Sequence, residues 1–253
     1  MEKQGMYMKK KLLYMFTVLF LFSNLVFGLT RGEIRTGIRY KIRDTTDTLN
    51  NDNPRWADGI LNQRINNAQD FIVGYTHCLY DKYLISPVTG QSEYNLPPGW
   101  TTIDRVSYMH TTSTSGYKKL TQSEQVNLDR DMQTWEIRTA GYPMYYYIRG
   151  SSIGIVPKPS GGYSHANALK IEYYKKPTDL TADTDIPFDG FYNLYIWHDL
   201  IECKVTAECL EDENKTTQAD YLWKRFFMLL EIMKTETRWK PDYNPQIKFN
   251  FSP

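Results

Sequence analysis

Two pairs of residues have the types and the spacing that enzyme chemistry or metal binding would require. His77 stands directly before Cys78, as a base beside a nucleophile could, but adjacent residues of a helix do not face each other. His198 and Glu202 are one helical turn apart and could together hold a metal ion weakly. Because a capped or core histidine is far commoner than such a two-ligand site, we predict no metal site here.

The cysteines and the loop acids provide no second set of ligands or nucleophiles. Cys78, Cys203 and Cys209 are odd in number and form no CxxC motif, so we interpret them as free, buried thiols. The chain lacks GxGxxG, P-loop, HExxH and GxSxG motifs, and its loop acids lack calcium-loop spacing. The sequence therefore predicts no catalytic residue, no cofactor and no metal, and a protein that is not an enzyme.

The stretch from Asn53 to Tyr75 reads as a helix around which the rest of the chain is arranged. Asn53 is a favourable N-cap, and Pro54 occupies the first helical position, where the missing N–H costs nothing. Apolar residues at helical spacing predict one buried stripe: Trp56, Ile60, Leu61, Ile65, Ala68 and Ile72. The opposite face is rich in amides: Arg55, Asp58, Asn62, Gln63, Asn66, Asn67 and Asp70. This face is either a solvated surface or a contact surface for a neighbouring protein.

Composition points to interaction more than to chemistry. The chain has 253 residues, enough for one domain with extensions, and 41% of them are hydrophobic, enough for a core. Lys and Arg number 30 against 29 Asp and Glu, so no overall field draws the protein onto nucleic acid. Its 20 tyrosines and 6 tryptophans suit packed surfaces that are partly wet, although an aromatic core would look similar.

The N-terminal segment, residues 1–28, has the pattern of a signal peptide. Lys9, Lys10 and Lys11 precede an apolar run from Leu12 to Phe27 that is short for a membrane span. The alternative is that the true start of the chain lies later, since the globular pattern begins near Thr30. We exclude residues 1–28 from the fold.

A short helix follows, about Arg31 to Arg43. Thr30 and Glu33 have the spacing of a capping box. Four arginines at four-residue spacing form a basic stripe on this helix: Arg31, Arg35, Arg39 and Arg43. Such a stripe is usually solvated, but it could meet phosphates or acidic residues of a partner.

The middle of the chain, about residues 84–177, reads as a small antiparallel β-region inserted in a helical protein. Alternating apolar residues predict three strands: Ser92–Leu96, Ile103–Tyr108 and Leu169–Tyr173. The aromatic segment Tyr142–Ile148 and the segment Ile153–Val156 predict a hairpin with its turn at Gly150-Ser151. His110–Lys119 reads as a loop, and Leu120–Asp129 as a helical turn.

Two helices, Phe191–Leu210 and Thr216–Thr235, follow the β-region, and the short break between them implies an antiparallel pair. They complete the predicted core: Trp197, Leu200, Leu222 and Phe226. The tail, residues 238–253, has no regular period and is either frayed or an arm that orders on a partner. We thus predict a mainly helical α+β domain over residues 29–237. It would be a bundle of about four helices with an inserted antiparallel β-hairpin region and an extended C-terminal arm.

Residues in a fixed order along the chain resemble one known family. The resemblance begins with Arg55-Trp56, Asp58, Leu61, Ile65-Asn66 and Ala68-Gln69 and continues in Glu93–Pro97 and Arg105–Tyr108. The later positions are Trp135, Pro143, Tyr145–Tyr147, Ile153–Ile155, Pro157, Tyr173-Tyr174, Pro177, Asp185 and Pro187. From about Thr30 to Glu236 the chain resembles the head-to-tail adaptor (connector) proteins of tailed bacteriophages.

The resemblance implies a structural protein of the virion neck. Identical subunits, typically about twelve, would form a ring beneath the portal protein, extend the channel for double-stranded DNA without reading its sequence, and carry the tail or nozzle protein. A ring needs two different patches on each subunit, which the polar face of the Pro54–Tyr75 helix and the C-terminal helix pair would supply. We expect the subunit or portal contacts at the polar helix face and the tail: Arg55, Asp58, Asn62, Gln63, Asn66, Gln69, Asp70, Trp239, Tyr243, Phe249 and Phe251.

Two functions of other classes stay open. A secreted or periplasmic binding protein with a cleaved signal peptide would have such an N-terminus, and sequencing of the mature product would then find a start near Gly28. A hydrolase would use scattered His and Asp residues such as His198 and Asp199. Replacement of both without loss of virion assembly would count against it.

Overall fold

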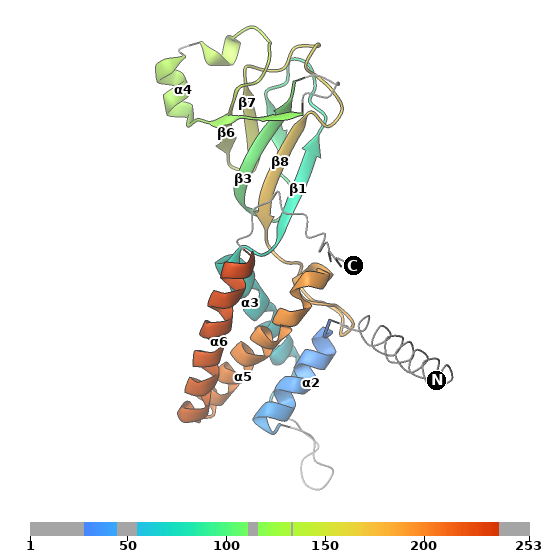
Figure 1. Ribbon diagram of the computed structural model, residues 1–253, viewed down its shortest axis with the longest axis vertical. Coiled ribbons are helices and arrows are strands. Elements are labelled where there is room, and N and C mark those ends of the chain that lie inside the picture. Colours follow the sequence, from blue (N-terminus) through green and yellow to red (C-terminus); the bar gives the residue numbers. More distant parts are fainter. Residues whose placement is uncertain (1–27, 45–54, 111–115, 133, 238–253) are drawn as a thin grey trace, which may run out of the picture. The chain divides into compact units, whose positions relative to one another are not determined.

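The computed structural model describes residues 28–44, 55–110, 116–132 and 134–237 (Figure 1). The chain divides into two compact units: residues up to Gln69 with Thr178–Leu230, and Asp70–Pro177 with the residues from Glu231. The signal-like segment up to residue 27, the expected helix start at Asn53 and Pro54, and the arm 238–253 lie outside the described residues. Among the helices that are described, none combines the length and the apolar content of a membrane span.

The first helix of the first unit is α2, Arg31–Ile42, and its predicted capping box is confirmed. The Thr30 hydroxyl accepts a hydrogen bond from the Glu33 N–H, and the Glu33 carboxylate accepts one from the Thr30 N–H. Arg43 ends the helix in the left-handed conformation, with φ of 58°. The helix buries its isoleucine stripe, at residues 34, 38 and 42.

The long helix α3, Asp58–Thr76, begins later than the sequence predicts. Arg55 and Trp56 precede it, and the carboxylate of Asp44 accepts hydrogen bonds from both of their N–H groups, at 2.7 and 3.1 Å. The chain is therefore held in a bend at these residues. Ala57 accepts the first helical bonds, from the N–H groups of Ile60 and Leu61.

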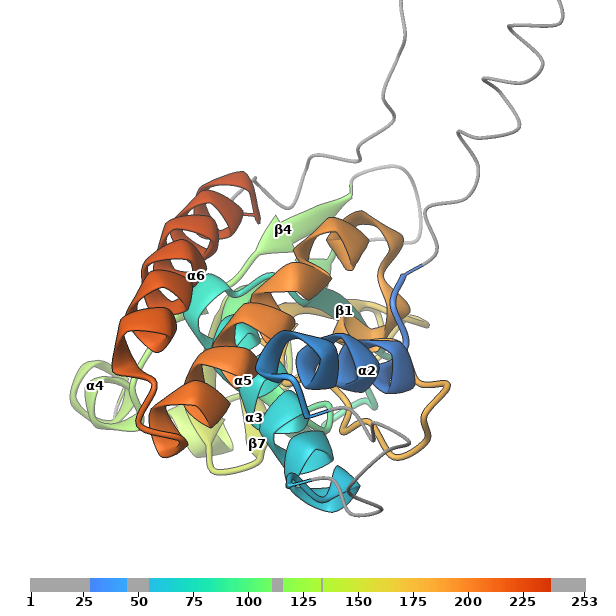
Figure 2. The same ribbon diagram turned by 90° about the horizontal axis from the view of Figure 1, so that it is seen from below.

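From Thr178 onward the chain forms two short 3₁₀ helices and two α-helices: η2 Phe188–Gly190, η3 Tyr192–Trp197, α5 His198–Asp212 and α6 Thr216–Thr237. The part of α6 from Glu231 belongs to the second unit. The predicted helix Phe191–Leu210 is thus divided into η3 and α5. The antiparallel pair is confirmed, and Figure 2 shows α5 lying between α2 and α6. This central position explains why α5 is buried on most of its circumference, including Leu200, Ile201 and Val205.

The predicted helical core is only partly correct. Its buried members are Leu61, Ile65, Ala68, Ile72, Trp197, Leu200 and Phe226. Ile60 is 46% exposed, because it lies one residue off the buried line that starts at Leu61. Trp56 and Leu222 are half-buried. The Trp56 ring lies under the guanidinium of Arg64, 4.7 Å from its centroid.

The second unit contains two four-stranded sheets. One has the order β1-β8-β3-β4 and is antiparallel: Tyr80–Ile85, Leu169–Lys175, Trp100–Met109 and Tyr117–Lys119. The other has the order β2-β7-β6-β5, with only β5 parallel to its neighbour: Glu93–Asn95, Ser152–Val156, Tyr145–Arg149 and Thr121–Gln122. The short helices α4, Gln125–Asp131, and η1, Trp135–Ile137, follow β5.

One hydrophobic core joins the two sheets. Val106 and Tyr108 of β3 and Ile171 of β8 pack with Ile153 and Ile155 of β7, so each sheet covers the inner face of the other. The Tyr108 hydroxyl donates to the Tyr163 carbonyl at 2.7 Å, which satisfies the one polar atom of this buried ring. Figure 1 shows β3, β8 and β1 side by side in the first sheet.

The predicted fold class is wrong. The described residues form five α-helices and two complete sheets, not a mainly helical bundle of about four helices with inserted hairpins. The hairpin β6–β7 at Gly150 is confirmed. The sequence reading missed β1, β4 and β5, because short strands with mixed polar and aromatic residues show no clear period of two until a partner strand covers them.

Candidate interaction surfaces

Two of the amide side chains that were predicted to face a neighbour, those of Asn66 and Gln69, form hydrogen bonds inside the subunit. Asn66 donates to the Leu180 carbonyl at 3.2 Å and accepts the Leu180 N–H at 3.0 Å. Gln69 is fully buried; it donates to the Thr178 carbonyl at 2.8 Å and accepts the Phe188 N–H at 3.1 Å. Gln69 is therefore not an interface residue. Both amides bind the segment that returns from the sheets to the helices.

The basic stripe of α2 forms ion pairs within the first unit. The Arg35 guanidinium lies 2.6 Å from the Asp183 carboxylate and 3.0 Å from Asn62 Oδ1, and Arg39 lies 2.6 Å from Asp58. Hydrogen bonds from Arg35, and to a smaller extent from Arg31, lower the pKa of Asp183 to about 2. Three of the four arginines of the stripe, Arg31, Arg35 and Arg39, thus already have acidic partners within the first unit.

The other predicted contact positions of the long helix remain accessible to different degrees. Arg55 pairs with Glu213 at 3.2 Å, and Asp70 with Lys176 at 3.0 Å. Gln63 is exposed. An interface role for Arg55, Asp58, Asn62, Gln63 and Asp70 stays a prediction.

The residues that suggested chemistry do not form a site. His198 is buried, and Glu202 pairs with Lys41 at 2.5 Å rather than with the histidine. Burial raises the pKa of both Cys203 and Cys209 to about 11, as expected for unreactive thiols, and Cys78 is half-buried. Within the described part of the chain, no three His, Cys, Asp or Glu side chains gather as metal ligands would.

The burial of His198 predicts a loss of stability in mild acid. Burial lowers its pKa from 6.5 to about 4, against a smaller opposing effect of the Leu29 backbone. Between these two values the unfolded chain binds a proton that the folded chain excludes, so stability falls as the pH falls. We expect urea denaturation to show a loss of about 2 kcal/mol from this group between pH 7 and pH 5.

A variant separates this effect from other titrations. His198→Phe removes the titrating group from its position against the rings of Phe188 and Tyr195, and should lessen the pH dependence relative to the unmodified chain. An equal pH dependence in His198→Phe and the unmodified chain would contradict the assignment.

An exposed apolar patch lies on the outer face of α6. Tyr221 and Met228 are two helical turns apart on the side opposite the buried Phe226 and Leu230, and are 67% and 58% exposed. Phe227 is 52% exposed at the edge of this face and stacks on Trp223, with ring centroids 5.8 Å apart. We call Tyr221, Phe227 and Met228 the α6 patch. Helix α6 thus carries apolar side chains that are largely exposed in the described part of the chain.

A second apolar patch lies on η3, where the chain enters α5. Tyr192 and Ile196 are 76% and 65% exposed, and Phe191 beside them is 39% exposed. We call these three residues the η3 patch. Clusters of exposed aliphatic and aromatic side chains on one unit mark surfaces that other proteins cover. The first unit therefore carries two different apolar patches, on different elements.

The comparison with known families gives these surfaces a context. Residues 30–246 match the family model described as SU10 adaptor protein, and this span includes both units. The chain belongs to the SU10 adaptor family. The chain matches no curated protein.

Members of the SU10 adaptor family are phage head-to-tail adaptors, which confirms the resemblance seen in the sequence. The chain is therefore a structural protein of the phage neck that interacts with other head and tail proteins. For an SU10 adaptor, exposed apolar patches are the surfaces on which such contacts are to be sought.

The sequence placed a ring contact on the C-terminal helix pair, but it did not identify the exposed residues of either patch. Ile196 was expected within one continuous helix, Phe191–Leu210. The signal was present in the run Phe226–Leu230, where five consecutive apolar residues exceed what one buried face of a helix can hold.

Proposed function

We propose that this SU10 adaptor forms a ring of identical subunits beneath the portal protein, about twelve by resemblance to other adaptors. The ring extends the channel for double-stranded DNA and provides the platform to which the tail or nozzle protein attaches. Neighbouring subunits meet through the α6 patch of one copy and the η3 patch of the next.

The observation that carries this proposal is the presence of two unlike apolar patches on one unit. A closed ring requires a heterologous interface, in which two different surfaces of each subunit meet. The α6 patch, in which Tyr221 and Met228 are largely exposed, would gain free energy if its apolar surface were removed from water in the mature particle. Contact with a second copy would cover it.

Electrostatics support a channel that lets DNA pass. The net charge of the chain is +1, and the arginines of α2 are engaged by acidic residues such as Asp58 and Asp183. Arginines that are already paired would make only weak contacts with DNA phosphates. Weak contacts favour passage, since each strong contact adds to non-specific affinity and would retard the DNA.

The remaining parts of the chain receive roles within the same proposal. Residues 29–237 would form the adaptor domain, with the β-region directed to tail contacts. The aromatic segment 238–253, which includes Trp239, Tyr243, Phe249 and Phe251, would order on the portal protein as an arm.

Assembly should depend on the portal. We expect the isolated chain to be a monomer or a loose oligomer in analytical ultracentrifugation at micromolar concentration, because the arm orders only on its partner. Added to the portal protein of the same phage, it should sediment with the portal as a stoichiometric complex. A stable ring without portal would contradict the portal-dependent step, and the absence of any complex would contradict the proposed function.

A further inference from the structure

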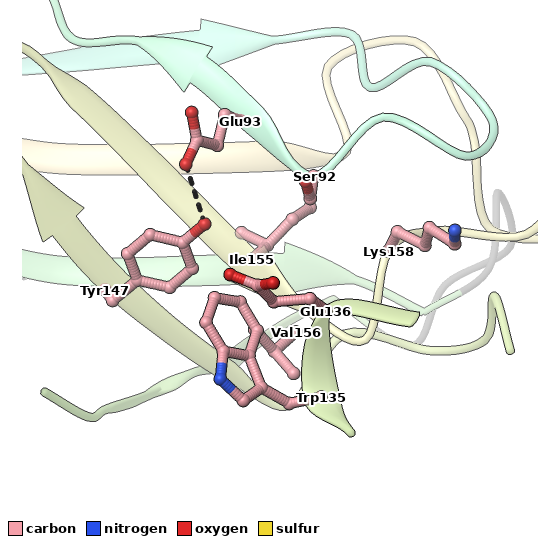
Figure 3. A pocket seen from close by; sticks show the side chains of 8 residues that line it. All are labelled: Ser92, Glu93, Trp135, Glu136, Tyr147, Ile155, Val156 and Lys158. Atoms are coloured by element: carbon pink, nitrogen blue, oxygen red, sulfur yellow. Dashed lines mark hydrogen bonds between the residues drawn. The ribbon is translucent and has the colours of Figure 1, made fainter. Parts of the chain in front are cut away.

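A small pocket in the second unit combines fixed aromatic rings with two carboxylates (Figure 3). Its volume is about 130 Å³, which is enough for one side chain but not for a larger ligand. The pocket is formed by β2, η1, β6, β7 and the residues after β7. Its lining residues are Ser92, Glu93, Trp135, Glu136, Tyr147, Ile155, Val156 and Lys158.

The two rings of the pocket are held in place by their surroundings. The Trp135 indole N–H donates to the Asp129 carboxylate at 2.7 Å, and its ring meets that of Tyr147 edge to face at 5.2 Å. The Tyr147 ring lies against Gly154 so closely that a Cβ there would come within 2.0 Å of it. The pocket is therefore preformed, and an entering group would lose little free energy in ordering it.

The charge of the pocket favours a cation. The Tyr147 hydroxyl donates to Glu93 at 2.9 Å, and burial, this hydrogen bond and the charges of Glu93 and Glu136 raise the Tyr147 pKa. Arg149 lies 3.9 Å from Glu93 but is largely exposed. Figure 3 shows the Glu136 carboxylate directed into the pocket and the Lys158 ammonium directed away from both carboxylates.

We propose that this pocket binds an arginine side chain presented by another head or tail protein. The guanidinium would pair with Glu136 and stack on Trp135, while its aliphatic stem contacts Ile155 and Val156. A planar guanidinium can form two parallel bonds to a carboxylate and lie flat on an indole, which the ammonium of lysine cannot. The pocket would thus be a contact point on the second unit, separate from the patches proposed to build the ring.

The test uses the full chain labelled with 5-fluorotryptophan and followed by ¹⁹F NMR. Trp135→Phe identifies the resonance of Trp135 among those of the six tryptophans. The probe is N-acetyl-arginine amide, and N-acetyl-citrulline amide is its uncharged counterpart of similar shape. We expect the arginine compound to shift the Trp135 resonance saturably in the millimolar range, and the citrulline compound to bind at least about fivefold more weakly.

Two variants show whether the carboxylate is responsible. Glu136→Gln, at an exposed position, should weaken binding of the arginine compound at least about fivefold without affecting the fold. Glu124→Gln removes an exposed carboxylate of the same unit outside the pocket and should leave binding unchanged. Equal shifts with both compounds, no shift of Trp135 up to about 50 mM, or unaltered binding in Glu136→Gln would overturn the proposal.

Discussion

Replacement of Gln69 with leucine should lower the free energy of unfolding by about 2–4 kcal/mol, because two buried backbone groups would lose their partners. The side chain of Gln69 is fully buried, and its amide binds the Thr178 carbonyl and the Phe188 N–H. Leucine fills a similar volume but can bind neither group. The segment around Thr178 and Phe188 would then be released from α3, so we expect the loss to appear in a urea melt.

Gln63 provides the matched control. It is the same residue type on the same helix, but it is exposed. Gln63→Leu should change the free energy of unfolding by less than about 0.5 kcal/mol. If the two variants were equally stable, the amide of Gln69 would not be holding the returning segment.

Introduction of lysine at Met228 or Tyr221 should prevent ring formation on the portal. Each side chain is largely exposed in the subunit, so the change should leave folding intact. In the proposed interface the lysine would be buried without a partner, at a cost of about 2 kcal/mol or more per contact, roughly a thirtyfold loss of affinity. Because the same contact recurs between all neighbours, the effect multiplies around the ring.

The measurement is co-sedimentation of each variant with the portal protein. Tyr40→Lys is the control, since Tyr40 is 77% exposed but belongs to neither patch. It should assemble as the unmodified chain does. Normal assembly of the Met228→Lys and Tyr221→Lys variants would show that the α6 patch is not a subunit interface.

Local signals in the sequence predicted local structure well. Thr30 and Glu33 correctly predicted the start of α2, because all the residues of a capping box lie within four positions of the sequence. Gly150 marked the β6–β7 turn, where its φ of 58° suits glycine. The order of packing and turn residues along the chain also led to the correct family.

Features that depend on distant partners could not be read in this way. Gln69 looked like a surface amide because its partners, near Thr178 and Phe188, are more than a hundred residues away. Strand β1 was missed because its mixed polar and aromatic residues show no clear period of two, and its partner strand β8 lies far along the chain. The exposed residues of the two apolar patches were missed for a third reason, because an apolar residue in a helix is counted as core unless the structure shows that nothing covers it.

The most direct test of the account is a cryo-electron microscopy structure of the portal protein bound to the full chain. We predict a closed ring of subunits beneath the portal, with Tyr221 and Met228 of each subunit packed on Tyr192 and Ile196 of the next. A ring whose subunits meet elsewhere while Tyr221 and Met228 face solvent, or a portal that binds no ring, would contradict it.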